Sequence, residues 1–401
     1  MAITDKEQGV WELDQVYNKI NQGGIWSYDG TNALFGWGYN LFGYVGDNDR
    51  VNRSSPTQIS GTTWTELSNA HLQRDVSVAF KNNELYCWGN NSFGALGQND
   101  LTIRSSPTQV PGTWSAGAAI RKAVLATKTD GTAWVWGHNE YGVLGMNVGN
   151  DVDKRSSPVQ LGTDATWGTS REKLGGGWYA SYAIKANGTL WSWGYNGDGQ
   201  LAQNNTTGYS SPMQVGTNTT WDKLCDGGYN YMGALKTDGS LWVWGDGEYG
   251  QLGLNKGGDP SPRRQSSPCQ VGTETTWSNA VFGNLGCLAV KTDGTLWVWG
   301  KNDEGELGQN QGPSQLARVS SPTQIGTDAT WSASLASGNL ETWAAVKTDG
   351  TLWTWGSGGN QGQLGLNQQA STPRRSSPTQ IPGTSWDKLS GGQVFHSTQI
   401  L

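Results

Sequence analysis

Cysteine is scarce in this sequence, with four in 401 residues. Cys87, Cys225, Cys269 and Cys287 stand at positions where other stretches of the same sequence pattern carry a different residue. Such interchangeable positions favour buried, reduced thiols that behave as small apolar side chains. The low count therefore excludes a fold held together by a disulfide framework.

Histidine is scarcer still. The three histidines are His71, His138 and His396. None stands in a pattern with cysteine or carboxylates that indicates a metal site or an activated nucleophile. The segment GNDVDKR offers Asn150, Asp151 and Asp153 as oxygen ligands but lacks the remaining ligands of a calcium site. We therefore expect no enzyme, no catalytic residues, no metal and no cofactor.

An excess of basic residues is also absent. Lysine and arginine number 27 against 33 acidic residues, which gives a net charge of −6, and there is no basic tail. A sequence-independent nucleic-acid footprint needs clustered positive charge, so nucleic-acid binding is not expected. Residues 1–24 have no charged-then-apolar leader, so neither a secretory signal nor membrane insertion is predicted.

Tryptophan and glycine are abundant instead, with 23 and 59 copies. A Trp-Gly pair, as in DGTLWVWG at 293–300, recurs at steps of 51, 48, 57, 51, 55 and 56 residues. The seven tryptophans of these pairs are Trp37, Trp88, Trp136, Trp193, Trp244, Trp299 and Trp355. Self-similarity at this period is typical of a propeller or another repeat array.

Two further phrases follow the same period. Ser-Ser-Pro followed by Gln occurs seven times, from 54–59 to 376–381, and each copy is followed by a lone tryptophan. Counting the position two residues before each Trp-Gly tryptophan, 19 of the 23 tryptophans fall in repeat positions. The even spacing argues for one closed unit over several independent domains.

Each repeat is interpreted as four strands. Asp-Gly flanked by alternating residues is a strong hairpin signal, and the strands around it are apolar on both faces. Such strands need cover on both sides, as in sheets that stack face to face. Ser-Ser-Pro begins an edge strand, because proline cannot donate to a ladder. The lone tryptophan begins a glycine-rich strand, which suits an inner position where neighbouring blades crowd together.

The two ends of the chain complement each other. Residues 386–392 and 393–400 supply the first two strands of a repeat, and then the chain stops. The first repeat lacks those two and begins with its last two strands, at 33–38 and 54–59. A raw sheet edge invites aggregation, so we predict one blade shared by both ends. The fold class expected is all-β, a seven-bladed β-propeller of four-stranded blades over residues 30–401.

The succession of GG, AL-x-TDG-x-L-W-x-WG, GQLG-x-N and SSP-x-Q-V resembles the repeat of the regulator of chromosome condensation family. The resemblance covers roughly residues 30–401 and implies a seven-bladed propeller. It also implies functions found in that family, such as nucleotide exchange on a small GTPase or inhibition of a protein partner. Because functions are grafted onto folds, the resemblance by itself selects none of these.

Loops that vary between repeats are the candidate binding elements. The longer loops at 255–265, 310–319 and 367–375 are polar. The candidate partner-binding residues in them are Arg263, Arg264, Arg374 and Arg375. The alternative is that these are ordinary solvated loops, which are variable in most proteins.

Residues 1–29 stand outside the repeats and are assigned to an N-terminal extension. A possible capping box at Thr4 and Glu7, apolar residues at helical spacing and Gly23-Gly24 predict a short amphipathic helix. The residues proposed to anchor it are Trp11, Leu13, Val16, Tyr17 and Ile20. The helix could pack under the propeller or dock on another protein.

Two functions remain open. The N-terminal residues and the regular RSSPTQI phrases resemble repeat proteins of marine bacteriophages, which suggests a non-enzymatic virion component such as a tail-fibre, collar or capsid-surface protein. Its partners would be other virion proteins, in multiple copies in a symmetric particle. The alternative is a cytoplasmic propeller that regulates a protein partner as an exchange factor or inhibitor does.

Overall fold

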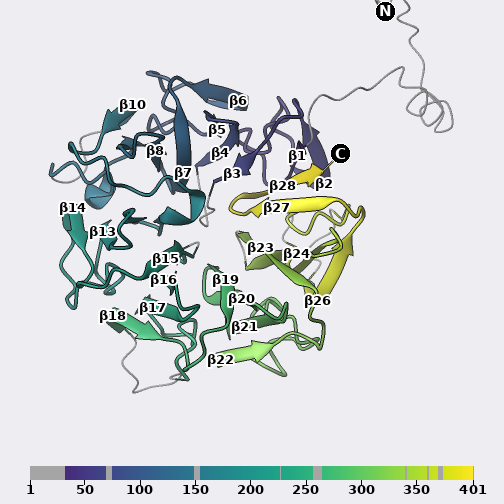
Figure 1. Cartoon of the computed structure of the whole chain (residues 1–401). Coiled ribbons are helices and arrows are strands. Elements are labelled where there is room, and N and C mark those ends of the chain that lie inside the picture. The colour runs from purple at the N-terminus through teal and green to yellow at the C-terminus, as the bar shows by residue number, and fades with distance from the viewer. Residues whose placement is uncertain are drawn as a thin grey trace, which may run out of the picture.

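The computed structural model describes residues 32–68, 75–148, 154–225, 227–255, 264–338, 341–358, 361–368 and 374–400. Within these residues the chain forms seven four-stranded antiparallel sheets, arranged as the blades of a propeller around a central axis (Figure 1). The predicted all-β, seven-bladed fold is confirmed. The predicted N-terminal helix and Arg263 lie outside the described residues, as do His71, Asn150, Asp151 and Asp153.

Each blade runs from an innermost first strand to an outermost fourth strand, and blade 1 contains both the first and the last described strands, β1 and β28. Blade 1 comprises β27 (Trp386–Ser390), β28 (Val394–Ile400), β1 (Asn32–Gly38) and β2 (Arg53–Ile59). Blade 2 comprises β3 (Glu66–Leu67), β4 (Val76–Lys81), β5 (Glu84–Gly89) and β6 (Arg104–Val110). Blade 3 comprises β7 (Trp114–Ile120), β8 (Ala123–Lys128), β9 (Ala133–Gly137) and β10 (Arg155–Gln160). Blade 4 comprises β11 (Leu174–Gly176), β12 (Ala180–Ile184), β13 (Leu190–Gly194) and β14 (Tyr209–Gln214).

The remaining blades follow the same plan. Blade 5 comprises β15 (Trp221–Leu224), β16 (Tyr231–Lys236), β17 (Leu241–Asp246) and β18 (Arg264–Gln270). Blade 6 comprises β19 (Trp277–Phe282), β20 (Gly286–Lys291), β21 (Leu296–Lys301) and β22 (Arg318–Gln324). Blade 7 comprises β23 (Trp331–Gly338), β24 (Thr342–Lys347), β25 (Leu352–Ser357) and β26 (Arg374–Ile381). Two short 3-10 turns, η1 (Glu140–Gly142) and η2 (Arg171–Lys173), lie between strands.

The propeller has two distinct ends. The Trp-Gly face carries the loops between first and second strands and between third and fourth strands, and the Trp-Gly pairs lead into the latter. The Asp-Gly face carries the hairpin turns between second and third strands and the loops from one blade to the next. Because neighbouring strands of a blade are antiparallel, blades 2 to 7 contribute the same kinds of loop to the same face, whereas blade 1 has no turn between its second and third strands, β28 and β1.

The repeated phrase DGTLWVWG encodes a self-consistent hairpin. Asp293 Oδ1 accepts hydrogen bonds from Thr295 N at 3.0 Å and from Thr295 Oγ1 at 2.7 Å. Trp297 Nε1 donates to the same hydroxyl at 2.8 Å, and the Lys291 ammonium lies 3.8 Å from the centre of the Trp297 ring. The aspartate, threonine, tryptophan and lysine therefore hold one another in place, as expected of an Asx turn with a cation–π contact.

The Trp-Gly tryptophans join each blade to the one before it. Trp299 Nε1 donates to the carbonyl oxygen of Gln251 in blade 5 at 2.9 Å, and the ring closes with Trp37 Nε1 donating to Gln363 in blade 7 at 3.0 Å. All seven of these tryptophans make the corresponding bond, at 2.7 to 3.0 Å. Buried indole N–H groups need such a partner, so the repeat builds its own ring of contacts.

The closing blade has the predicted composition. Its strand order is β2-β1-β28-β27, and β1 pairs with β28 from Asn32 opposite Ile400 to Gly38 opposite Val394. In Figure 1 the two ends of the colour scale meet in this blade. The chain is thus closed by hydrogen bonds between its first and last described strands, which confirms the prediction.

Glycine at the inner strands reflects close contact between blades. A Cβ added to Gly176 of β11 would lie 2.5 Å from Ile120 in blade 3. A Cβ added to Gly391 would lie 1.9 Å from the carbonyl oxygen of Ser337 in blade 7. Real Cβ atoms do not approach other atoms so closely, so the expected crowding at these inner positions is confirmed.

None of the four cysteines forms a disulfide bond, and Cys87, Cys225 and Cys287 are buried. Burial raises the pKa of the Cys87 and Cys287 thiols. The expectation of burial is wrong for Cys269, which is half-exposed because it lies on the outermost strand β18. No helix in the described part of the chain is long and apolar enough to cross a membrane.

These environments predict the thiol chemistry. Alkylation in denaturant without reductant should add four labels per chain, measured by intact mass. In the native state Cys269 should react first, because the thiolate of a buried cysteine is both disfavoured and shielded. Two labels or none in denaturant would contradict the prediction, because that result requires disulfide bonds.

Candidate protein-binding surfaces

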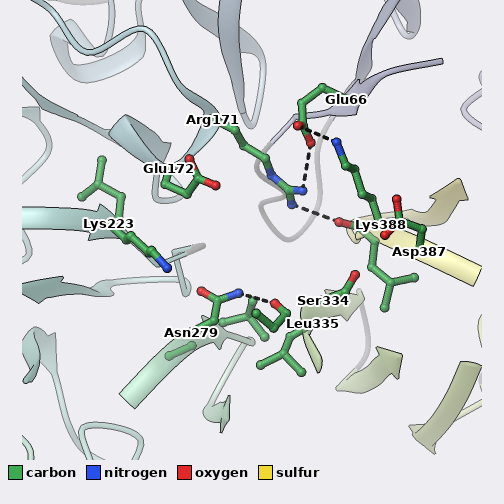
Figure 2. A pocket seen from close by; sticks show the side chains of 14 residues that line it. Glu66, Arg171, Glu172, Lys223, Asn279, Ser334, Leu335, Asp387 and Lys388 are labelled. Carbon is green, nitrogen blue, oxygen red and sulfur yellow. Dashed lines mark hydrogen bonds and ion pairs between the residues drawn. The ribbon is translucent and has the colours of Figure 1, made fainter. Parts of the chain in front are cut away.

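A cavity of about 360 Å³ lies where the inner strands converge, lined by residues of β3, η2, β15, β19, β23 and β27. Figure 2 shows charged side chains on several sides of it, with Glu66, Arg171 and Lys388 close together. The Lys388 ammonium lies 2.8 Å from Glu66 Oε2 and donates to the Thr65 carbonyl oxygen at 2.6 Å. Arg171 Nη1 lies 3.6 Å from Glu66 Oε1, and Arg171 Nη2 donates to Leu389 O at 3.0 Å.

Other polar side chains that line the cavity also form hydrogen bonds to the neighbouring blade. Asn279 Nδ2 donates to the Ala333 carbonyl oxygen of the next blade at 2.7 Å, as Figure 2 shows. Lys223 Nζ donates to Ser278 O at 3.3 Å, again across a blade boundary. Since the polar groups of the cavity bind one another across blades, its contacts mainly stabilise the ring.

A different surface lies on the Trp-Gly face of blades 3 to 5. We call Tyr141, Trp178, Tyr179, Tyr195 and Tyr229 the tyrosine surface. The Tyr141 ring centre lies 4.8 Å from that of Tyr179 and 5.0 Å from that of Tyr195. The Trp178 and Tyr229 ring centres are 4.3 Å apart. These spacings are typical of favourable aromatic pairs, so the rings hold one another in a defined arrangement.

Arg121 of blade 3 supports this surface. Its guanidinium carbon lies 4.1 Å from the centre of the Trp178 ring and 4.6 Å from that of Tyr179. Its terminal Nη1 also lies 3.7 Å from Glu140 Oε2. A cation held between two aromatic faces and a carboxylate is fixed in position, and its attraction to the rings is strengthened by partial desolvation.

The tyrosine surface belongs to a wider distribution of exposed apolar side chains. Seven large apolar residues are exposed in the described part of the chain. Five of them stand on loops of the Trp-Gly face: Leu41, Val51, Leu101, Tyr141 and Tyr229. Exposed apolar residues that gather on one face, and not singly over the whole surface, indicate a site of interaction.

This surface was not predicted from the sequence. The one signal for it was Trp178, because among the described tryptophans only Trp178 and Trp343 fall outside the three repeat positions. Trp343 packs in the core between blades 6 and 7 and is 2% exposed. The neighbours of Trp178 are different: Tyr229 is 39% exposed and Tyr141 is 41% exposed.

Two of the predicted arginines, Arg264 and Arg374, form ion pairs across blade boundaries. Arg264 Nη2 lies 2.8 Å from Asp198 Oδ1, and Arg374 Nε lies 2.6 Å from Glu304 Oε2, each carboxylate belonging to the preceding blade. Arg375 Nη2 donates to Gln368 Oε1 at 2.9 Å. The Arg264 and Arg374 side chains are 59% and 51% exposed even though each forms an ion pair. Their contact with a partner protein remains a prediction.

The two described histidines have different surroundings. His138 Nδ1 lies 3.3 Å from Glu140 Oε2 beside the tyrosine surface. His396 is buried, with Nε2 3.3 Å from Val45 O. Over the ranges that the structure describes, no three His, Cys, Asp or Glu side chains are grouped so as to hold a metal ion.

A buried carboxyl on the Trp-Gly face carries the clearest pKa shift. Glu306 is 3% exposed and accepts hydrogen bonds from Asp303 N at 2.9 Å and from Glu304 N at 2.6 Å. Burial, and secondly the charge of Glu341, raises the pKa of Glu306 to about 8. The corresponding residue in three other blades is a glutamine: Gln200, Gln251 and Gln363. Blade 6 therefore has a carboxyl group, whose neutral form burial favours, where those blades have an amide.

The shift predicts a pH-dependent stability. Below about pH 4.5 Glu306 is protonated in both the folded and the unfolded chain, and its full contribution to stability is present. As pH rises toward 8 the unfolded chain ionises first, so stability falls by about 2–4 kcal/mol across that window. Glu306→Gln should flatten the dependence of the melting temperature on pH between 5 and 8.5, whereas an unchanged slope would contradict the assignment.

Comparison with known protein families gives repeated matches along the chain. The model described as the Regulator of chromosome condensation (RCC1) repeat matches residues 82–120, 187–226, 238–290, 293–339 and 349–393. A second model of the same description matches residues 172–200. Together these ranges fall on blades 2 to 7 and on the first strand of blade 1, and they cover more than half of the chain.

Individual relatives agree with this result. The Ultraviolet-B receptor UVR8 of Arabidopsis thaliana is 26% identical over 292 residues, which are 71% of this chain and 64% of the relative. The mitochondrial RCC1 domain-containing protein RUG3 of the same plant is 30% identical over 240 residues, 56% of this chain and 51% of the relative. The matched regions thus span less than two thirds of these relatives.

Solved structures show the same fold. Human WBSCR16 has a TM-score of 0.77 at 18% identity, covering 92% of this chain and 99% of that one. Prp20p of Saccharomyces cerevisiae has a TM-score of 0.76 at 19% identity, covering 93% and 92%. Since the family repeats match over more than half of its length, this chain belongs to the regulator of chromosome condensation (RCC1) repeat family.

Proposed function

We propose that this protein is a non-enzymatic propeller that regulates a protein partner, and that the partner docks on the tyrosine surface. The observation that carries the proposal is the set of exposed rings around Tyr141 and Tyr229, held by Trp178 and Arg121. Tyrosine, tryptophan and arginine dominate the energetics of protein interfaces, because large rigid side chains lose little conformational entropy on binding.

The relatives favour this reading over a virion component. UVR8 and RUG3 are proteins of a plant, and Prp20p has binding properties toward Gsp1p and histones. Protein binding of this kind, brought to the present chain as a proposal, needs a docking surface and no catalytic group. None of these comparisons supports the tail-fibre, collar or capsid-surface hypothesis.

The test uses the full chain purified from its own cells together with whatever protein it carries. After the partner is identified, its affinity is measured for the wild type and for Tyr141→Ala combined with Tyr229→Ala. The double variant should bind at least about 30-fold more weakly, because loss of two interface tyrosines typically costs about 2 kcal/mol or more. Met213→Ala, an exposed apolar residue on the outer strand β14, is the matched control and should change affinity less than twofold.

Sedimentation of the native protein separates the two functional classes. A stable complex with one partner, weakened by the tyrosine variants only, supports the regulator. Co-sedimentation with a megadalton particle that is unaffected by those variants would support the virion hypothesis instead. In that case a chain beginning at Gly24 should fold normally and fail to join the particle, as expected if residues 1–24 are the anchor.

A further inference from the structure

In blades 3 to 7 a lysine stands just before the hairpin turn between the second and third strands, and some of these lysines pair with a carboxylate while others do not. We call them the hairpin lysines: Lys128, Lys185, Lys236, Lys291 and Lys347. Each lies over the tryptophan that follows its hairpin turn, which is Asn187-Gly188 in blade 4 and Asp-Gly in blades 3, 5, 6 and 7, with the ammonium 3.7 to 4.5 Å from the ring centre. In blades 4, 6 and 7 a carboxylate from the loop entering the blade pairs with this ammonium. The pairs are Lys185 with Asp164, Lys291 with Glu274 and Lys347 with Asp328. The protein thus places a carboxylate on the lysine–tryptophan pair in three blades.

In blades 3 and 5 that carboxylate is absent, and the structure shows why. The loop entering blade 5 has Asn218 at the position of Asp164. Asn218 Oδ1 accepts hydrogen bonds from Thr220 N at 2.8 Å and from Thr220 Oγ1 at 2.6 Å, as Asp164 does from Thr166. Its second side-chain atom is an amide nitrogen, which is a donor and cannot accept from the ammonium of Lys236.

Blade 3 also lacks this carboxylate, because the loop that enters the blade is shorter. Its entering loop has only Pro111, Gly112 and Thr113 between the last residue of β6 and Trp114, so it has no position for an acid. Among the described residues neither Lys128 nor Lys236 forms an ion pair. The hairpin carboxylates Asp130 and Asp238 accept hydrogen bonds from Thr132 and Ser240 through Oδ1, and they lie beyond ion-pair distance of these two lysines, on which their charges act only at longer range.

Both of these lysines open into a groove at the outer seam between blades. The first groove, of about 420 Å³, lies between blades 4 and 5 and is lined by Trp221, Lys236 and Trp242, with Asn218 on its wall. The second, of about 330 Å³, lies between blades 2 and 3 and is lined by the equivalent Trp114, Lys128 and Trp134. Two grooves of the same lining, at equivalent positions of the repeat, therefore present an ammonium without a carboxylate.

We propose that these two grooves bind carboxylate side chains of an acidic, extended segment of a partner protein. The carboxylate would take the place that Asp164, Glu274 and Asp328 occupy in the other blades, on an ammonium already positioned over an indole. The net charge of −6 opposes general adsorption of acidic peptides, so binding must come from these local contacts. The inference rests on the proposed function only for the source of the carboxylate, because the grooves are separate from the tyrosine surface.

Substitution of Asn218, on the wall of the groove between blades 4 and 5, tests whether that groove binds carboxylates. Fluorescein-labelled octaglutamate is titrated with the full chain at about 150 mM salt, near physiological ionic strength, and binding is followed by anisotropy. Asn218→Asp supplies the missing carboxylate at a position where two other blades carry aspartate, so it should fold normally and bind at least about fivefold more weakly. Asn218→Asp combined with Lys128→Gln should lose binding at least about 20-fold.

Three controls test whether binding needs the two proposed grooves, whether it needs carboxylates, and whether it is independent of the tyrosine surface. Lys347→Gln, in a blade with its own acid, should change affinity less than twofold, and octaglutamine should not bind. The Tyr141→Ala, Tyr229→Ala variant should bind octaglutamate normally, so failure of the proposed docking surface would be seen separately. The inference is overturned if octaglutamate fails to bind at about 1 mM or if Asn218→Asp binds like the wild type. It is equally overturned if Lys347→Gln loses as much affinity or if free acetate competes at the same carboxylate concentration.

Discussion

A chain that ends at Ser385 should fail to fold as a closed propeller. It loses β27 and β28, and with them Trp386, Leu389, Val394 and Phe395, none of which is more than 5% exposed. Burial of side chains of this size contributes roughly 1.5–3 kcal/mol each, so their removal takes away about 6–12 kcal/mol. That is comparable to the entire stability of an ordinary domain.

The missing strands also leave β1 with an unpaired edge. Trp37 loses the stacked ring of Phe395, whose centre is 5.6 Å away, and β1 loses its ladder with β28. Circular dichroism melting should show no cooperative transition for this chain, or one at least about 15 °C lower. A chain that ends at Gln399 is the matched control and should melt within a few degrees of the wild type, since Ile400 is 53% exposed. A truncated chain that melts like this control would show that the shared blade does not close the ring.

Gly391→Ala should destabilise the propeller more than most single substitutions do. The added Cβ would lie 1.9 Å from the carbonyl oxygen of Ser337 and 2.6 Å from its carbonyl carbon. Those atoms are backbone of the neighbouring blade, so relief requires a shift of β27 against β23. Overpacking that cannot be relieved by a side chain costs about 3 kcal/mol or more, which urea unfolding would measure as a loss in the free energy of unfolding.

Gly312→Ala is the control for that measurement. No atom lies within 4 Å of a Cβ built on Gly312, and the residue is not in a left-handed conformation. Its substitution should change the free energy of unfolding by less than about 0.5 kcal/mol. Equal effects at the two positions would mean that alanine acts through the unfolded chain and not through contact between blades.

Much of the fold could be predicted because the same pattern of strands and turns occurs seven times in the sequence. The Asp-Gly turn, the threonine that follows it and the tryptophan of DGTLW interact within one hairpin, so their spacing in the sequence is the spacing of the contact. The shared blade was also predictable, since each chain end lacks the strands that the other supplies. Both inferences use only local geometry and the need to satisfy strand edges.

The candidate binding sites could not be predicted from the sequence to the same extent. Tyr141, Trp178 and Tyr229 come from three different blades, and nothing in their sequence spacing brings them together. Arg264 and Arg374 stand in variable loops, as predicted, but their partners Asp198 and Glu304 belong to the preceding blades. A pattern that repeats along the chain identifies the residues each blade shares, and it is silent about pairs formed across a boundary by residues outside the pattern.

The amino-acid sequence by itself determined the number of blades, the role of each repeated tryptophan position and the place where the ring closes. These are properties of one repeat unit copied seven times, and local hydrogen bonding and burial decide them. Only the tertiary structure decided which loops stand together on the Trp-Gly face, and that Lys236 faces Asn218 where Lys185 faces Asp164. The physical reason is that these contacts join residues of different strands and loops, so they exist only after the blades have packed.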